Sequence, residues 1–358
     1  ETMRRDEKML PQRRGRAGVL PQLLCLGGLA LVLSGCLAGC SASGVAKRDN
    51  RKTEPDLVLC YGEVNPEGHI MTDSAKFFAD EVERLSEGRI VVEIYPSGQM
   101  GDDQQCYRAM QMGSLDLYRG NSASLAECGN PMISALALPY IFRDREHFWK
   151  VCESGLGQEI LDDIEVSAKG MKGIAYLDEG ARNFFTRERP VTRIEDMKDL
   201  KIRMQLSGLM EDTVAALGAK AVPIAYVELY TALQSGSVDG AENPPVSYFY
   251  NKFYEVAPYY VKDSHTYAPG VILISEITWD SLTEEEQQVI LEAARLTQEY
   301  NREEIERADR QAYQALKEAG VEILELEDPE AWSAAVEPVY QKYGAQFLEL
   351  IRQVREMR

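Results

Sequence analysis

The chain has 358 residues, 45% hydrophobic and 27% charged, a composition typical of a globular protein and long enough for two lobes. Its formal net charge of −19 at pH 7 argues against nucleic acid and anionic membrane surfaces as partners. The same charge repels an anionic ligand at long range, so any anion site must be a local group of arginines and backbone donors.

The first forty residues have the pattern of a bacterial signal peptide. Three arginines between positions 13 and 16 precede an apolar run over 19–33, which is too short to span a bilayer comfortably. The sequences LSGC and LAGC follow, and both resemble the lipobox at which a lipoprotein precursor is cleaved and its new N-terminal Cys is diacylated. We therefore expect lipidation at Cys36 or Cys40 and a flexible tether over 41–55, the alternative being two cysteines placed in the leader by chance.

Seven cysteines are present, and three of them belong to the leader and its two lipoboxes. The other four have neither CxxC nor zinc-finger spacing: Cys60, Cys106, Cys128 and Cys152. An extracytoplasmic location permits disulfides, but no spacing identifies a pair. Disulfides and buried free thiols therefore both remain open.

The first half of the chain after the tether predicts an α/β lobe with a mainly parallel sheet. Strands are expected at 56–61 and 89–95, and 113–121 reads as a turn, a short strand and a polar exit; apolar residues at helical spacing predict helices at 73–86 and 102–112. Ligands of such lobes bind beyond the carboxyl ends of the strands. Glu63, Asn65 and Asn121 lie at such ends and are candidate ligand contacts.

The second half repeats the alternation of strands and helices and adds three polar candidates. Arg182 lies just past a strand predicted at 171–177, Arg203 lies within a strand, and Asn243 follows a turn and short strand. Two prolines after Asn243 predict an extended exit. The remaining expected strands are at 200–204, 237–242, 270–275 and 321–326, and the remaining helices at 209–217, 227–234 and from 329 onward.

A long helical pattern covers 283–319, with Thr283 and Glu286 forming a capping box and Gly320 ending it. At about 1.5 Å per residue such a helix is roughly 54 Å long, more than one small lobe needs. We expect it to cross both lobes.

No catalytic motif is found in the sequence. GxxxxGK[ST], a complete GxGxxG and a GxSxG elbow are missing, and His69, His147 and His265 have no HExxH companion. We therefore expect a protein that is not an enzyme and uses neither a cofactor nor a metal.

Arg203 is the strongest candidate for an anion site. It stands between Ile202 and Met204, so its side chain points away from two apolar neighbours and needs a partner if it is buried. Its planar guanidinium matches a carboxylate with two parallel bonds. Arg182 would add a second positive centre, for which surface ion pairing is the alternative.

Two uncharged residues complete the predicted site. Asn243 would donate to the same carboxylate, because its amide has donors without a charge of its own. Tyr226 would supply an apolar or stacking wall, although a core tyrosine is the commoner explanation. The arginines predict a small organic acid as ligand, and we expect a sugar acid with one carboxylate.

Several stretches together resemble one family, the DctP-like solute-binding proteins of tripartite ATP-independent periplasmic (TRAP) transporters. The resemblance runs from about residue 57 to the end. It rests on YPSGQMGDD (95–103), MGSLDL (112–117), ALPYIF (137–142), GARNFFTRERPV (180–191), EDMKDLKIRM (195–204), LGAKAVPIAYVELYTALQSGSVDGAENP (217–244) and KFYEVAPYY (252–260).

The resemblance implies a role for each site residue. The selectivity-filter arginine of the family falls on Arg203, its second arginine on Arg182, its carboxylate-binding asparagine on Asn243, its aromatic wall on Tyr226 and a first-lobe polar contact on Asn121. One departure is the aspartate in KDLK at 198–201, where KGLK is usual, and this change lies in a loop.

The resemblance also implies two α/β lobes of the periplasmic-binding type, a cleft that closes on the ligand, and a long helix between the lobes. We expect the first lobe at 56–179 plus 269–308 and the second at 180–268 plus 309–358. The implied partner is a membrane permease pair driven by an ion gradient. The implied location is a periplasm or the outer face of the cytoplasmic membrane, with a lipid anchor.

The narrower pattern DEGARNFF…AENPPVSY looks most like members that bind hexuronates such as glucuronate or galacturonate. Pro244 departs from it, because a second Asn often stands there. C4-dicarboxylates, keto acids and sialic acid remain open as ligands. A ligand-sensing lipoprotein for a signalling partner, or a structural surface lipoprotein without a ligand, also remains open, as do the oligomeric state and the permease.

Overall fold

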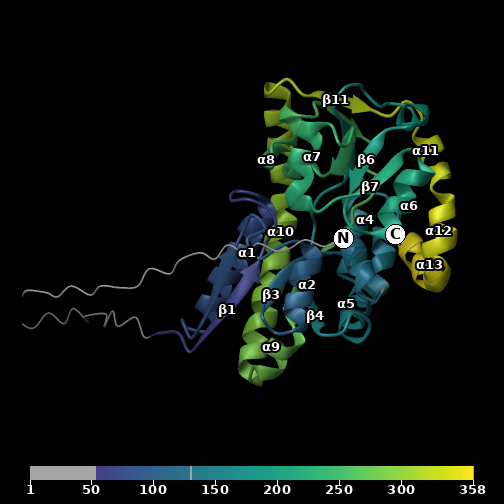
Figure 1. The fold of residues 1–358 in the computed structure, drawn as a ribbon. Helices are drawn as coiled ribbons and strands as arrows, with labels where there is room; N and C mark the ends of the chain where they lie inside the picture. Colours follow the sequence, from purple (N-terminus) through teal and green to yellow (C-terminus); the bar gives the residue numbers. More distant parts are fainter. Residues whose placement is uncertain (1–53, 130, 358) are drawn as a thin grey trace, which may run out of the picture. The chain divides into compact units, whose positions relative to one another are not determined.

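The computed structural model describes residues 54–129 and 131–357. The predicted leader, both lipobox cysteines and nearly all of the tether lie outside these residues. The described chain is an α/β protein whose strands form two sheets, called the first and the second sheet below (Figure 1).

The first sheet has the order β2-β1-β3-β10-β4. Its strands are β1 (Leu57–Gly62), β2 (Ile90–Tyr95), β3 (Leu117–Asn121), β4 (Met171–Leu177) and β10 (Gly270–Ser275). β1 runs parallel to β2 and β3, whereas β10 runs antiparallel to both of its neighbours, β3 and β4. The sheet is therefore mainly parallel, with β10 as its one reversed strand.

The second sheet has the order β11-β9-β5-β8-β6-β7. Its strands are β5 (Asn183–Thr186), β6 (Lys201–Met204), β7 (Lys220–Pro223), β8 (Gly240–Asn243), β9 (Tyr259–Lys262) and β11 (Glu322–Glu325). β5, β7 and β9 were not predicted from the sequence. At four residues each they are as short as β6, β8 and β11, which were predicted, so length alone does not explain the difference.

The helices cover the faces of the sheets and connect their strands. They are α1 (Ile70–Leu85), α2 (Asp103–Gln111), α3 (Ser122–Leu125), α4 (Arg145–Cys152), α5 (Gly155–Ser167), α6 (Gly208–Ala216), α7 (Leu229–Ser235), α8 (Pro245–Tyr250), α9 (Glu276–Ser281), α10 (Glu284–Glu318), α11 (Pro329–Ala335), α12 (Glu337–Tyr343) and α13 (Leu348–Glu356). Short 3-10 turns include η1 (Ala126–Cys128) and η4 (Tyr226–Glu228).

Two helix starts differ from the sequence prediction. α1 begins at Ile70 rather than at residue 73, because the His69 ring accepts a hydrogen bond from the backbone N–H of Met71 and caps the helix three residues earlier. Pro244 is extended as predicted, but Pro245 opens α8 instead of continuing the extended exit. Proline fits the first helical position, since its missing N–H has no partner there and its φ is already helical.

The long helix is confirmed. α10 has 35 residues, and the Thr283 side chain accepts from the N–H of Glu286 while Glu286 bonds back to Thr283. It packs against α1 and β4 beside the first sheet and against α8 beside the second (Figure 1). α10 therefore links the two halves of the described chain.

Two further segments cross between the sheets side by side. The chain passes from β4 to β5 through Arg182, and from β9 to β10 through Thr266, and these two residues pair as an isolated antiparallel bridge. The polar candidates at the strand ends of both sheets are thereby brought close together. The exact lobe boundaries expected from the sequence stay a prediction.

Apolar clusters fill the space between helices and sheets. One lies between the first sheet and the helices α1 and α10, with Phe78, Ile272 and Ile290 at its centre. Another lies between the second sheet and the helices α7 and α8, around Phe185 and Tyr248. The four described cysteines are free thiols, so the structure supports the unpaired alternative for them.

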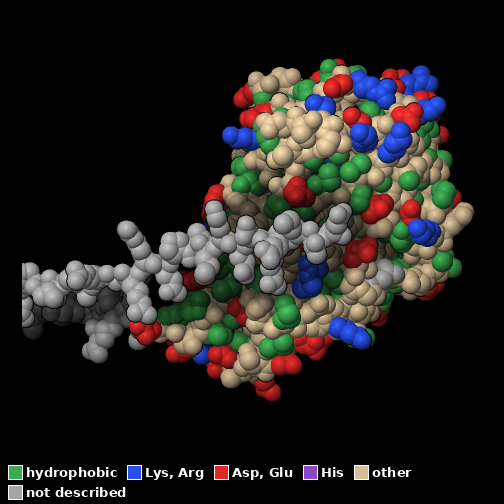
Figure 2. Space-filling view, in the orientation of Figure 1, with side chains coloured by type: hydrophobic (Ala, Val, Ile, Leu, Met, Phe, Trp, Pro, Cys, Tyr) green, Lys and Arg blue, Asp and Glu red, His purple; other side chains and the backbone are tan. Residues whose placement is uncertain are grey.

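The surface carries mixed charges. On the face drawn in Figure 2, acidic and basic side chains alternate with apolar ones over the described residues. Exposed ion pairs such as Lys262–Glu325 (2.9 Å) contribute little to stability. Within the described ranges, no helix combines the length and the apolar character that crossing a membrane requires.

Candidate ligand-binding site

A cavity lies where strand ends of both sheets meet. Its volume is about 40 Å³, room for a few water molecules, so its walls lie close together. Its walls come from the ends of β1, β3 and β4, from β6 and β8, and from α2, α8 and η4. The lining residues are Val64, Asn65, Asp103, Arg119, Asn121, Glu179, Arg182, Arg203, Gln205, Tyr226, Asn243 and Ser247.

Six of the seven candidate contacts from the sequence line this cavity: Asn65, Asn121, Arg182, Arg203, Tyr226 and Asn243. The seventh, Glu63, is buried beside it and is not part of the wall. Its carboxylate instead accepts two hydrogen bonds from Arg119, at 3.1 and 3.0 Å. Whether any of these residues contacts a ligand stays a prediction.

Arg203 is held in place by β6, between β7 and β8, and only 1% of its surface is exposed. Its Nε donates to the carbonyl of Ile224 at 2.8 Å, and the Tyr226 ring centre lies 5.7 Å from the guanidinium carbon. Both terminal nitrogens are buried without a hydrogen-bond partner among the described residues. Burial lowers the pKa of Arg203 to about 10, which still leaves it charged at neutral pH.

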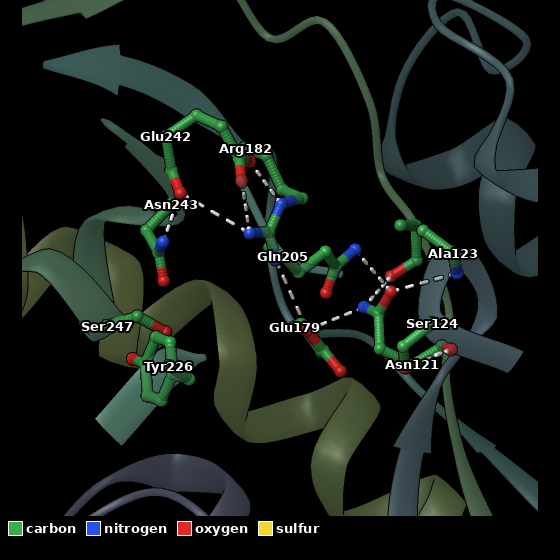
Figure 3. Close-up of polar contacts among 12 residues, drawn as sticks. Asn121, Ala123, Ser124, Glu179, Arg182, Gln205, Tyr226, Glu242, Asn243 and Ser247 are labelled. Atoms are coloured by element: carbon green, nitrogen blue, oxygen red, sulfur yellow. Dashed lines mark hydrogen bonds and ion pairs between the residues drawn. The ribbon is translucent and has the colours of Figure 1, made fainter. Parts of the chain in front are cut away.

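Arg182, in contrast, is already neutralised. Its Nε and Nη2 donate to the two carboxylate oxygens of Glu242 at 2.5 and 2.8 Å (Figure 3). Burial alone would raise the pKa of Glu242, but the charge of Arg182 outweighs it and lowers that pKa to about 2. Asn243 follows Glu242 at the end of β8, and its amide donates to the Glu242 carbonyl.

His265 extends this ion pair away from the cavity. Its Nδ1 lies 2.7 Å from Asp263, and its Nε2 lies 3.5 Å from Glu242. Burial lowers its pKa, but the two carboxylates outweigh burial and raise the pKa to about 9. The imidazole is therefore a cation at neutral pH and stacks on the ring of Phe184.

A second arginine pair was not identified from the sequence. Arg119 lies in β3, and beside its two bonds to Glu63 it donates to Glu179 at 2.6 Å. Glu179 also accepts from Asn121 at 3.0 Å and lies 3.7 Å from Arg182 (Figure 3). We call the six residues Glu63, Arg119, Glu179, Arg182, Glu242 and His265 the paired region.

The sequence contained a signal for Arg119. Like Arg203, it is an arginine inside a strand of mostly apolar character, so the same reasoning that selected Arg203 applies to it. Asp103 lies on a helix and Gln205 lies just after a strand, and neither residue carries a comparable signal.

Hydrogen bonds join the two sheets across the cavity. Tyr226 donates to the amide oxygen of Asn65 at 3.2 Å, and Gln205 donates to that of Asn121 at 3.1 Å. Asn65 and Asn121 follow or end strands of the first sheet, whereas Gln205 follows a strand of the second and Tyr226 lies in η4, after β7 of that sheet. The two walls of the cavity are therefore in direct contact.

The chemistry of the wall is that of a binding site. Three guanidinium groups, several amides and two carboxylates surround the space, and no group of three His, Cys, Asp or Glu residues in 54–129 and 131–357 is arranged to hold a metal. Two sheets joined by crossing segments and a long helix, with a polar cavity between them, define a two-lobed solute-binding protein.

Comparison with known proteins identifies the family. Residues 61–346 match the model of DctP, bacterial extracellular solute-binding protein, family 7. The chain is 30% identical to the C4-dicarboxylate-binding periplasmic protein DctP of Rhodobacter capsulatus over 325 residues, 89% of this chain and 96% of the relative. The chain therefore belongs to the DctP family of extracellular solute-binding proteins, which serve TRAP transporters.

Solved structures agree with this assignment. A TRAP solute-binding protein from a Bradyrhizobium species in complex with galacturonate has a TM-score of 0.80 and 32% identity, covering 83% of this chain and 99% of that one. One from Pseudomonas putida F1 with bound D-glucuronate has a TM-score of 0.81 and 29% identity, covering 84% and 97%. The protein is thus an extracytoplasmic TRAP solute-binding protein for a small organic acid, and its family is one of transport rather than catalysis.

Proposed function

We propose that the organic acid is a hexuronate, such as glucuronate or galacturonate, which the protein captures and delivers to the permease of a TRAP transporter. The observation that carries this proposal is Arg203. It is a buried cation on the cavity wall, both of its terminal nitrogens are unbonded, and no carboxylate of the described residues lies within 4.0 Å. A ligand carboxylate fits that planar fork with two parallel bonds.

The rest of the wall suits hydroxyl groups. Asp103 and Glu179 offer carboxylate oxygens, and Gln205 and Asn65 add amide groups that donate and accept. A sugar acid combines one carboxylate with several hydroxyls, each of which donates to such oxygens. Two relatives of about 30% identity, named above, hold hexuronates, and this supports the same ligand class here.

Within this proposal, Arg203 and Asn243 hold the ligand carboxylate and Tyr226 forms the wall beside it. Arg182, Asn65 and Asn121 contact the ligand from the other sides of the cavity. Glu63 lies behind Arg119 and orients it.

A thermal-shift screen tests the ligand class. Glucuronate, galacturonate, aldonates and C4-dicarboxylates are added to the purified protein, and each compound that raises the melting temperature is then titrated by calorimetry. We expect the hexuronates to give the largest shifts, because a bound ligand stabilises the folded state by mass action. A screen in which a dicarboxylate stabilises the protein and no uronate does so overturns the hexuronate proposal.

The second candidate is a C4-dicarboxylate. The relative from Rhodobacter capsulatus carries that name, and three guanidinium groups line the cavity, which is enough charge for two carboxylates if the arginines were free. The same screen separates the two candidates. A ligand-sensing role would share the site and differs only in the partner that the loaded protein binds.

We further propose that the protein is a lipoprotein, cleaved from its signal peptide and held at the membrane by a diacylated Cys36 or Cys40. The tandem lipoboxes in the sequence support this, and both lie outside the described residues. Two acyl chains anchor a protein stably, whereas one binds only marginally. If the double variant Cys36→Ala/Cys40→Ala is still processed and still partitions into detergent as the wild type does, the proposal of a lipid anchor is wrong.

A further inference from the structure

We propose that Glu179 limits the ligand to one carboxylate. It pairs with Arg119 and Arg182 at the same time, so that the site accepts one carboxylate and rejects a second. This inference rests on the proposed function, because it assumes that the ligand carboxylate binds at Arg203. It concerns which of the three arginines around the cavity remain free for an anion.

The position of Glu179 is central. It follows β4 on the segment that crosses between the sheets, and it is 8% exposed, toward the cavity. One carboxylate oxygen accepts from Arg119 at 2.6 Å. The other accepts from Asn121 at 3.0 Å and lies 3.7 Å from the Nη1 of Arg182, so one side chain serves both guanidinium groups (Figure 3).

The two guanidinium groups that Glu179 touches are also paired on their far sides. Arg119 donates to both oxygens of Glu63, and Arg182 donates to both oxygens of Glu242. Each of these arginines therefore faces two carboxylates. Arg203 has no ion pair among the described residues, so the cavity offers one uncompensated cation.

A second ligand carboxylate would meet an unfavourable environment. Apart from the three arginines, the charged groups on the cavity wall are Asp103 and Glu179, which are both acidic. Like charges at short range in a poorly solvated site repel strongly. Burial raises the pKa of Glu179, and the nearby carboxylate of Glu63 acts in the same direction, against the opposing charges of Arg119 and Arg182. Hydroxyl groups, in contrast, donate to these carboxylates without a charge penalty.

The experiment compares a hexuronate with the aldarate of the same stereochemistry, in which the C1 carbon is also a carboxylate: galacturonate with galactarate, and glucuronate with glucarate. Both members of the pair are titrated calorimetrically into wild-type protein. We expect the uronate to bind at least about 10- to 100-fold more tightly than its aldarate, the range that one like-charge contact produces. Equal affinity for both compounds overturns the inference without any variant.

The variant Glu179→Gln keeps the size of the side chain and removes its charge. We expect the preference for the uronate to fall by about 10-fold or more, because the negative charge on the wall that repels a second carboxylate is then removed. Glu179→Asp retains the charge and should retain the preference even if both ligands bind more weakly. A preference unchanged in Glu179→Gln overturns the inference.

Asp178→Asn is the matched control. It also removes a buried carboxylate from an arginine, Arg145 at 2.7 Å, and neither of these two residues lines the cavity. A preference that stays within about threefold of the wild type in this control attributes the effect to the position of Glu179 rather than to net charge. The result is also distinct from a failure of the proposed function. Wild-type protein that binds no uronate removes that function, whereas wild-type protein that binds uronate and aldarate alike removes the role of Glu179 alone.

Discussion

Two parts of the site differ in whether a buried arginine has a carboxylate partner. In the paired region, Arg182 donates to both oxygens of Glu242 and Arg119 is held between two glutamates. Arg203 is buried as deeply, and its terminal nitrogens have no partner among the described residues. The pKa values follow: burial lowers that of Arg203 to about 10, whereas Glu242 outweighs burial and raises that of Arg182.

The contrast separates arginines that stabilise the wall of the cavity from the arginine that is available to bind a ligand. A buried ion pair that is complete within the protein stabilises one arrangement of the chain, and it has no charge left for a small molecule. A buried cation without a counter-ion is costly in the empty protein, and that cost is relieved when an anion binds. Variants in the two parts should therefore affect different quantities.

The largest effect is expected in the paired region. Glu242→Gln removes the carboxylate that Arg182 and His265 share and leaves a buried guanidinium with Glu179 at 3.7 Å as its remaining carboxylate. We expect the free energy of unfolding to fall by about 3–5 kcal/mol, measured by chemical denaturation without ligand. Glu325→Gln, which breaks the exposed pair with Lys262, should cost no more than about 1 kcal/mol. Equal losses in the two variants would contradict the structural role of the pair.

At Arg203 the loss should appear in affinity instead. Removing one partner of a buried charged pair costs about 2–5 kcal/mol, or about 30- to 4,000-fold in affinity. Arg203→Lys keeps the charge but loses the fork, so it should also bind more weakly than wild type. Stability without ligand should not fall as it does in Glu242→Gln, because no carboxylate of the described residues loses its partner when Arg203 is replaced.

The control for this prediction is Arg189→Ala. Arg189 is exposed and donates to backbone carbonyls of the same half of the chain, so its loss should leave affinity unchanged. Calorimetric titration of the folded variants decides the question. If Arg203→Ala and Arg203→Lys bind the wild-type ligand within about threefold, the carboxylate is held elsewhere.

The pH dependence of stability tests the charge of His265 in the paired region. The carboxylates of Asp263 and Glu242 outweigh burial and raise the pKa of His265 from its ordinary 6.5 to about 9. A raised pKa means that the folded state binds the proton more tightly than the unfolded chain does. The resulting stabilisation is fully present below pH 6.5 and is lost as the pH rises to about 9. The expected loss is on the order of 3 kcal/mol.

Denaturation curves between pH 6.5 and 9 measure this loss, and His265→Gln should flatten the pH profile in that window. His147→Gln is the control, because burial lowers the pKa of His147 and it does not titrate there. Parallel profiles for the wild type and His265→Gln would mean that His265 does not hold its proton in the folded protein.

Much of the fold could be predicted from the sequence because its larger elements have local signals. The strands β4 and β10 and the helix α10 have clear apolar runs or periodicity, and α10 has its capping box. The missed strands β5, β7 and β9 are fixed by neighbouring strands far away in the chain rather than by a pattern of their own.

The site divides in the same way. Arg203 was selected because a charged residue within an apolar strand is unusual, and this is a local observation. The partners that distinguish it from Arg182 are not local, since Arg182 and Glu242 are 60 residues apart and Arg119 and Glu63 are 56 apart. Which arginine is neutralised therefore depends on tertiary structure, and it could not be derived from spacing.

The smallest expected effect lies between the two parts, at Tyr226. Its ring faces the guanidinium of Arg203, and its hydroxyl donates to Asn65 of the opposite wall at 3.2 Å and accepts from Asn251 at 2.8 Å. Tyr226→Phe keeps the ring beside the cation and removes one of the two hydrogen bonds between the walls. One neutral hydrogen bond contributes about 0.5–1.5 kcal/mol, so affinity should fall by about 2- to 12-fold.

Tyr226→Ala should lose more than Tyr226→Phe, because the aromatic wall and its contact with the cation go with the hydroxyl. The matched control is Tyr230→Phe, whose hydroxyl donates to Glu255 and whose side chain does not line the cavity. Calorimetric titration of the three variants with the wild-type ligand separates the contributions. A Tyr226→Phe variant that binds as tightly as Tyr230→Phe would show that the bond between the walls does not contribute to binding. Any loss in Tyr226→Ala would then come from the ring alone.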